Sequence, residues 1–352
     1  MTERDSVVSS ISGDRPESRR KLLLRLRLAA ALALLFPISA ASQGYQPPRH
    51  SRVPSPLLAG ADPIEIQGRA NDGMQIERDR SPGAELEEHR KLERSLGALV
   101  PQRRGVVDAY IVSIALDSDP VFAREARVGG DVLKRRYGAV GRTVVLAGAD
   151  GSGPSVLPRG TPQTLGIALA RVAELMNREE DVLVLFTTSH GARFGLYYHD
   201  SENGYGAISP SRLRLMLDEL GIANRLLILS ACYSGVFVPV LRSDRTAIVT
   251  AASADRTSFG CAAENDWTYF GDAMINRALR KPQPLDAAFA EASGLIASWE
   301  SQTGIAPSQP QFSAGPGAAR WLAGLDSRAP KAATAPVGRP AFEPSGPLAP
   351  RR

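Results

Sequence analysis

The hydrophobic residues of the chain fall into short, nearly continuous runs, with amphipathic segments between and after them. Five runs rich in Val, Ile and Leu have the length of buried strands: 106–116, 142–148, 181–189, 224–231 and 245–253. Helical spacing of apolar residues occurs over 122–138, 161–178, 209–221, 266–279 and 284–299. Aliphatic strands that alternate with helices are typical of a mainly parallel sheet covered on both faces. The pattern predicts an α/β domain over residues 104–326.

Local signals refine two of these elements. The helix over 209–221 has Ser209 as a cap, Pro210 at its first position, and Gly221 as the left-handed residue that ends it. The polar stretch before it predicts a small hairpin, with Asn203-Gly204 as a tight turn.

The N-terminal segment has the pattern of an export signal. A basic stretch leads into an apolar run from Leu28 to about Ala41, and small residues follow. We interpret residues 1–42 as a signal peptide or an N-terminal membrane anchor, so the remainder is expected to be exported, either periplasmic or secreted. Contact with a membrane is expected only through an uncleaved form of this segment.

The segments on either side of the predicted domain have few apolar residues. Residues 43–103 are rich in Pro, Arg, Asp and Gly, apart from one helix signal at Leu92, Leu96 and Leu99, and we predict a largely disordered linker. Residues 327–352 are rich in Pro and Ala and are predicted to be a disordered tail.

Charge argues against a nucleic-acid partner. The 352-residue chain has a formal charge of +5, and residues 1–42 alone contribute seven basic and four acidic side chains. The remainder is therefore only weakly basic, with no stripe of basic and aromatic residues that would bind phosphates.

Two reactive side chains follow neighbouring strands of the predicted sheet. The strand 181–189 ends in His190-Gly191, and the strand 224–231 ends at Cys232, one of two cysteines. Ligands of such sheets bind beyond the carboxyl ends of the strands. A thiol beside an imidazole is suited to covalent acyl transfer, and the amides of Gly191 and Cys232 could stabilise an oxyanion.

Structural interpretations of the same residues are also open. A single cysteine at a strand end is usually a small buried hydrophobe, and a single histidine is usually structural. We find no set of ligands spaced for zinc, and Ser234 lacks the preceding glycine of a serine-hydrolase elbow. In an exported protein Cys232 and Cys261 could also form a disulfide, which would silence the thiol. We predict instead that Cys261 is a packed structural thiol.

The two strand ends resemble those of the legumain-type cysteine peptidases, relatives of caspases and gingipains. The resemblance rests on "VLVLFTTSHG", on "LLILSACYSG", and on the downstream segment "TAASADRTSFGCAAENDWTYFGD". It extends from about residue 110 to residue 278.

The resemblance implies a caspase-like three-layer α/β sandwich and hydrolysis of peptide bonds without a cofactor or metal. His190 would be the catalytic imidazole, Cys232 the nucleophile, and Gly191 a donor to the oxyanion. The matching positions for substrate binding are Arg124, Ser258 and Asp272.

The sequence also departs from the family pattern beside these positions. Ser230 stands where the eukaryotic legumains have a glutamate, and Glu125 stands where a histidine follows the arginine. A preference for asparagine therefore does not transfer. A helix N-terminal acid is the structural alternative for Asp272, and a solvated pair is the alternative for Arg124 and Glu125.

The expected function is that of a cysteine endopeptidase with a Cys-His dyad and an acyl-enzyme intermediate, acting on a peptide or protein. Two alternatives remain: a noncatalytic module that binds peptides or partners, and a peptide transamidase or ligase. Retention of both His190 and Cys232 favours an enzyme.

Overall fold

The computed structural model describes residues 55–343, which all belong to one unit of the chain. The predicted signal peptide or anchor at 1–42 lies outside the described residues, as does the end of the predicted tail. Within residues 55–343, no helix has both the length and the apolar character needed to cross a membrane.

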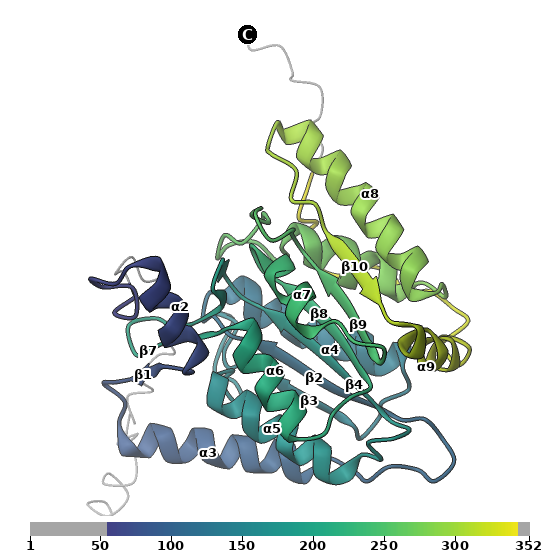
Figure 1. Cartoon of the computed structure of the whole chain (residues 1–352), viewed down its shortest axis with the longest axis horizontal. Helices are drawn as coiled ribbons and strands as arrows, with labels where there is room; N and C mark the ends of the chain where they lie inside the picture. The colour runs from purple at the N-terminus through teal and green to yellow at the C-terminus, as the bar shows by residue number, and fades with distance from the viewer. Residues whose placement is uncertain (1–54, 344–352) are drawn as a thin grey trace, which may run out of the picture. The chain divides into compact units, whose positions relative to one another are not determined.

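A six-stranded sheet forms the centre of the fold, in the order β10-β9-β8-β4-β2-β3 (Figure 1). Neighbouring strands are parallel except at β10, which pairs antiparallel with β9 at one edge. The predicted mainly parallel α/β sheet is thus confirmed. The strands are β2 (Ala109–Ala115), β3 (Thr143–Leu146), β4 (Val182–Thr188), β8 (Arg225–Ser230), β9 (Thr246–Thr250) and β10 (Gln311–Ala314).

Each face of this sheet is covered by helices. Side chains of β4 alternate between two cores, with Val184 and Phe186 in one and Leu183 and Leu185 in the other. The first core also contains residues of α4 (Pro120–Arg136), α8 (Leu285–Thr303) and α9 (Pro316–Asp326). The second contains residues of α3 (Pro82–Gly97), α5 (Pro162–Leu175), α6 (Pro210–Glu219) and α7 (Val238–Leu241). Three layers result, as burial on both faces of an aliphatic sheet requires.

Helix α4 lies close to the sheet because two glycines face it. A Cβ on Gly129 would lie 2.6 Å from the Phe186 ring, and one on Gly130 would lie 2.6 Å from a Val145 methyl. This close packing brings the first turns of α4 beside the carboxyl ends of β4 and β8, where the candidate site lies.

The predicted helix over 266–279 begins later than expected. Thr268 accepts the Gly271 N–H through its hydroxyl at 2.9 Å, as a cap does, and a π-helical segment η2 (Gly271–Arg277) follows. A short 3-10 segment, η3 (Ala278–Arg280), then leads to α8. Another 3-10 segment, η1 (Ser234–Phe237), follows the cysteine at the end of β8.

A smaller antiparallel sheet, in the order β1-β7-β6-β5, lies next to the histidine at the end of β4. Its strands are β1 (Gln75–Glu77), β5 (Gly191–Ala192), β6 (Gly195–Asp200) and β7 (Gly204–Ile208). The predicted hairpin is formed by β6 and β7. Its turn occupies 201–203, so Asn203 ends the turn and Gly204 begins the strand.

The prediction of a disordered linker over 43–103 needs correction for its described part, residues 55–103. This part contains α2 (Pro63–Asn71), β1 and α3. Strand β1 pairs with β7, and Leu92 and Leu99 are buried in the second of the two cores, the one that contains α5 and α6. The low apolar content misled the prediction because much of this segment is held by backbone pairing and by charges.

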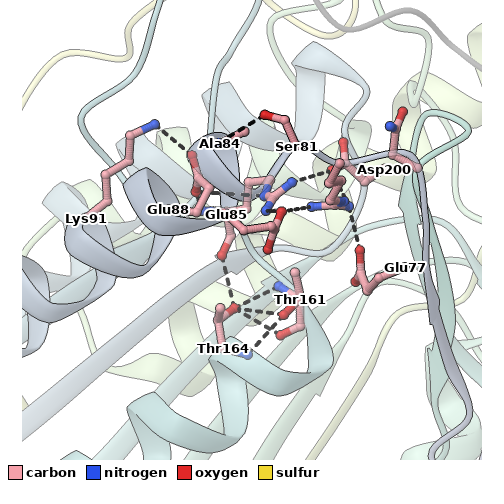
Figure 2. Close-up of polar contacts among 12 residues, drawn as sticks. Glu77, Ser81, Ala84, Glu85, Glu88, Lys91, Thr161, Thr164 and Asp200 are labelled. Atoms are coloured by element: carbon pink, nitrogen blue, oxygen red, sulfur yellow. Dashed lines mark hydrogen bonds and ion pairs between the residues drawn. The ribbon is translucent and has the colours of Figure 1, made fainter.

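Those charges centre on Arg80 and Arg159. Arg80 forms ion pairs of 2.7 Å with both Glu77 and Asp200. Arg159 pairs with Glu85 at 2.7 Å and donates its backbone N–H to Glu88 at 2.9 Å. Figure 2 shows these acidic side chains, from β1, α3 and β6, converging on one cluster. The cluster connects residues 77–88 to strand β6 of the small sheet through Asp200.

The predicted disordered tail is also different over its described part, residues 327–343. This segment, which we call the C-terminal strap, has no regular secondary structure but is hydrogen-bonded at several points along its length. The Asn276 amide accepts from Val337 N at 2.9 Å and donates to Val337 O at 3.0 Å. Phe342 stacks on Trp299 with ring centroids 6.1 Å apart. A Pro-rich sequence cannot form its own core, but it can be held by groups that bind its backbone.

We predict that the strap contributes to global stability. A chain that ends at residue 327 should have a melting temperature lower by roughly 5 °C or more, because buried partners such as Asn276 lose their hydrogen bonds. Scanning calorimetry would measure the change. A chain that ends at residue 343 is the matched control, and equal melting temperatures for the two truncations would refute a stabilising role.

Candidate active site

The register of β4 with β8 places the two predicted catalytic residues at equivalent positions. Thr188 is paired with Ser230 at the ends of these strands, and Ser189 N donates to Ser230 O at 3.2 Å. His190 and Cys232 each follow two residues after this pair. They therefore emerge side by side at the same sheet edge.

Gly191 packs directly against the cysteine segment. A Cβ at this position would overlap the Cys232 carbonyl oxygen and would lie 3.0 Å from the Ala231 methyl. Only glycine allows the backbone after His190 to approach Ala231 and Cys232 this closely. The predicted partners His190, Gly191 and Cys232 are thus brought together.

The Cys232 thiol is half-buried against the downstream loop. Its Sγ accepts the Ser258 N–H at 3.3 Å and lies 3.6 Å from the Ser258 hydroxyl. The Cys232 thiol also donates to the Ser258 carbonyl oxygen at 3.5 Å. Ser258, predicted as a substrate-binding residue, is therefore a direct neighbour of the sulfur.

The turn after the cysteine is strained. Tyr233 has φ 56°, in the left-handed region that a residue with a side chain rarely adopts. Its N–H donates to Arg256 O at 2.8 Å, and the Arg193 guanidinium lies 5.5 Å from its ring centre. These contacts hold a sharp bend that presents Cys232 at the strand end. Ser234 is buried and accepts the Ala252 N–H, in keeping with a structural role.

The imidazole of His190 lies in an acidic, partly buried setting. Its Nε2 is 3.5 Å from Asp119 Oδ2. Its ring packs edge-to-face with the Phe122 ring, with the two ring centroids 5.0 Å apart. Burial lowers its pKa, but hydrogen bonds to Asp119 and Cys261 and the charge of Asp117 outweigh burial and raise the pKa to about 11. His190 is therefore protonated at neutral pH.

Asp117, Asp119 and His190 each place one potential ligand atom within 4.8 Å of the others. Two carboxylates and an imidazole could in principle bind a divalent cation. The same arrangement also suits a protonated imidazole flanked by two acids. Asp119 pairs with His190 at 3.5 Å, whereas Asp117 accepts the Asp119 N–H at 2.9 Å and lies 3.7 Å from His199 Nδ1.

Two of the predicted substrate-binding residues are engaged inside the fold. Arg124 donates to the carbonyl oxygens of Ala263 and Asn265 and pairs with Asp266 at 3.7 Å. It thereby pins the downstream loop.

Asp272 is completely buried. Its carboxylate accepts from Asn276 at 2.8 Å, from Arg277 at 3.1 Å and from Ala341 N in the strap at 3.0 Å. The contacts of Arg124 and Asp272 are thus with groups of the protein itself, and their role in substrate binding stays a prediction.

The sequence analysis missed Asp119 and underestimated Glu125. Asp119 directly precedes α4 and makes no side-chain cap hydrogen bond there, since its carboxylate faces His190. The only sequence signal was an acid at the end of a predicted strand. Glu125, considered as half of a solvated pair, is instead fully buried between β4 and β8.

Both cysteines are free thiols in the structure. Cys261 packs beside a small cluster that includes Val121 and Phe122. This agrees with the predicted packed thiol, and its hydrogen bond to His190 adds a contact that was not expected.

Comparisons with known proteins agree with this arrangement. The sequence pattern of the Peptidase C13 family matches residues 159–315, which include His190, Gly191 and Cys232. This part of the chain is thus similar to the legumain-type Peptidase C13 family. Because this is a family of cysteine peptidases, the match supports a hydrolase that acts on peptide bonds. Arg124 and Glu125 lie before the matched residues.

Other comparisons are more distant. No curated protein sequence matches the chain. The crystal structure of caspase-1 from Spodoptera frugiperda resembles it with a TM-score of 0.39 and 13% sequence identity, covering 61% of this chain and 92% of that chain.

We predict that Asp119→Asn lowers the pKa of His190, because it removes the charged hydrogen-bond partner while burial persists. Histidine Cε1–H resonances followed by NMR would report this change. The pair should stabilise the fold fully below the unfolded-state pKa of about 6.5, and this stability should be lost as pH rises towards 11. The stability difference between wild type and variant should therefore shrink at alkaline pH.

Asp255→Asn serves as the control, since Asp255 is an exposed carboxylate that pairs with Arg256 at 3.9 Å. An unchanged His190 titration in Asp119→Asn would show that Asp119 does not set the protonation of the imidazole.

Proposed function

We propose that the protein is an endopeptidase of the C13 type, in which Cys232 is the nucleophile and His190 is the general acid and base. The supporting observation is the β4–β8 register, with Gly191 packed on the Cys232 carbonyl. This arrangement sets both side chains at one sheet edge. The thiol receives an N–H from Ser258, and the imidazole is flanked by acids.

Acylation begins with a Cys232 thiolate and a His190 imidazolium. The sulfur attacks the scissile carbonyl carbon, and the C=O electron pair moves to oxygen, where the amides of Gly191 and Cys232 would donate hydrogen bonds. Collapse of this intermediate breaks the C–N bond. His190 gives its proton to the leaving amine and becomes neutral.

Deacylation reverses the roles. Neutral His190 takes a proton from water as the water oxygen attacks the thioester carbonyl. The second intermediate expels the Cys232 thiolate, so the acid product leaves and the imidazolium is restored. Asp119 acts as a positioning residue in both halves, because its charge stabilises the imidazolium that the cycle requires.

The substrate is a peptide or protein, and its side chain would be chosen by groups near Ser258. Since Arg124 and Asp272 are satisfied within the protein, we do not carry over the asparagine preference of legumains. We place the activity outside the cytoplasm, on the strength of the sequence of residues 1–42.

We predict that Cys232→Ala abolishes cleavage of a diverse peptide library, because no other thiol in the described fold occupies the end of β8. Cys261→Ala is the control for loss of a thiol: it should keep the wild-type cut sites, while its rate can change because Cys261 bonds His190. Mass spectrometry of the products would show both the cuts and the residue before each. The test uses full-length protein under reducing conditions.

Three results would point elsewhere. Cuts that persist in Cys232→Ala would refute the assignment of the nucleophile. Loss of cleavage only in Cys261→Ala would transfer that role to Cys261. Products joined to added amines, without free acids, would replace hydrolysis by transamidation.

A further inference from the structure

A fully buried carboxylate lies beneath the strand ends that lead to His190 and Cys232. Glu125, in the second turn of α4, is 0% exposed. Its Oε2 accepts hydrogen bonds from the Thr188 hydroxyl and, at 3.2 Å, from the Ser230 hydroxyl. Its Oε1 accepts from the Thr268 amide at 3.0 Å and from the Thr268 hydroxyl at 2.7 Å. Burial raises the pKa of Glu125, and the hydrogen bonds from these four donors reduce this rise without cancelling it.

These donors belong to three separate parts of the chain. Thr188 is two residues before His190, and Ser230 is two residues before Cys232. Thr268 lies in the loop that follows Ser258 and caps η2. The carboxylate is therefore a common anchor for the acid–base segment, the nucleophile segment and the loop that contacts the sulfur.

The surrounding backbone is fitted to this side chain. A Cβ on Gly271 would overlap Glu125 Oε1, so glycine is needed where η2 passes the carboxylate. Ser230 and Thr268 also touch each other, with hydroxyl oxygens 3.4 Å apart. The cluster is thus a closed hydrogen-bonded unit whose members cannot shift independently.

We propose that Glu125 is a positioning residue of the peptidase: its carboxylate sets the separation of His190 and Cys232 by bonding the strand end beneath each. This proposal rests on the proposed Cys-His function. Glu125 does not touch the substrate. It acts through Thr188 and Ser230, and displacement of reacting groups by about 1 Å can cost roughly 100-fold in rate.

The test is Glu125→Gln in the full-length protein. Glutamine keeps the side-chain volume but replaces one acceptor oxygen by an NH₂ donor. In the wild type the Thr188 and Ser230 hydroxyls donate to Glu125 Oε2, so an NH₂ group at that position would face two donors. We expect kcat on a cleaved library peptide to fall by roughly 10- to 100-fold with KM nearly unchanged. We also expect slower alkylation of Cys232 by iodoacetamide, measured by peptide mass spectrometry against Cys261.

Glu300→Gln is the control for loss of a buried acid. Glu300 is 2% exposed and accepts Ser308 N at 2.9 Å, at the end of α8. It should lose stability but keep kcat and the Cys232 alkylation rate. If Glu125→Gln behaves in the same way, Glu125 is only structural and the proposal is overturned.

If Glu125→Gln does not fold, Thr188→Val and Ser230→Ala each remove one donor and keep the acid. Each should lower kcat, and the two effects together should be less than additive, because both act through one carboxylate. Wild-type kcat in both variants would overturn the proposal. If the wild type cleaves no peptide, the endopeptidase function fails on its own, while the Cys232 alkylation rates still decide the role of Glu125.

Discussion

The parallel pairing of β4 with β8 is the constraint on which the site depends. Backbone hydrogen bonds fix the register of two strands, and a shift of one residue would move every side chain to the opposite face. Here the two cores hold alternate residues of β4, so burial on both faces enforces that register. The positions of His190 and Cys232 therefore depend on the packing of β4 side chains in the two cores beneath the sheet edge.

Buried acidic side chains add a second constraint at this edge of the sheet. The carboxyl end of the sheet holds three buried acids, Asp117, Asp119 and Glu125, although burial of unpaired charge is costly. Asp119 is balanced by an imidazolium, and Glu125 by hydroxyl and amide donors. Two acids of one region are thus used differently, one to hold a proton on His190 and the other to hold backbone segments in place.

Five strands of the central sheet, the long helices between them and the placement of His190 and Cys232 could be predicted because each has a local signal. Aliphatic runs mark β2, β3, β4, β8 and β9, and small residues follow β4 and β8, whereas the edge strand β10 has no such run and was missed. The contacts of Glu125 could not be predicted in this way, since its partners lie 63, 105 and 143 positions away in sequence. The ordered structure of the flanking segments was missed for the same reason: Arg80 bonds Asp200, 120 positions away, and Val337 bonds Asn276, 61 positions away.

The C-terminal strap has a consequence for the order in which the fold can form. Arg339 N donates to Asp266 at 2.7 Å, and Asp266, in the loop downstream of Cys232, also pairs with Arg124 of α4. The strap follows the strands of the central sheet in the chain, so these strands leave the ribosome before it does. A nascent chain that has not yet reached the strap can pair its strands but lacks this contact to the downstream loop.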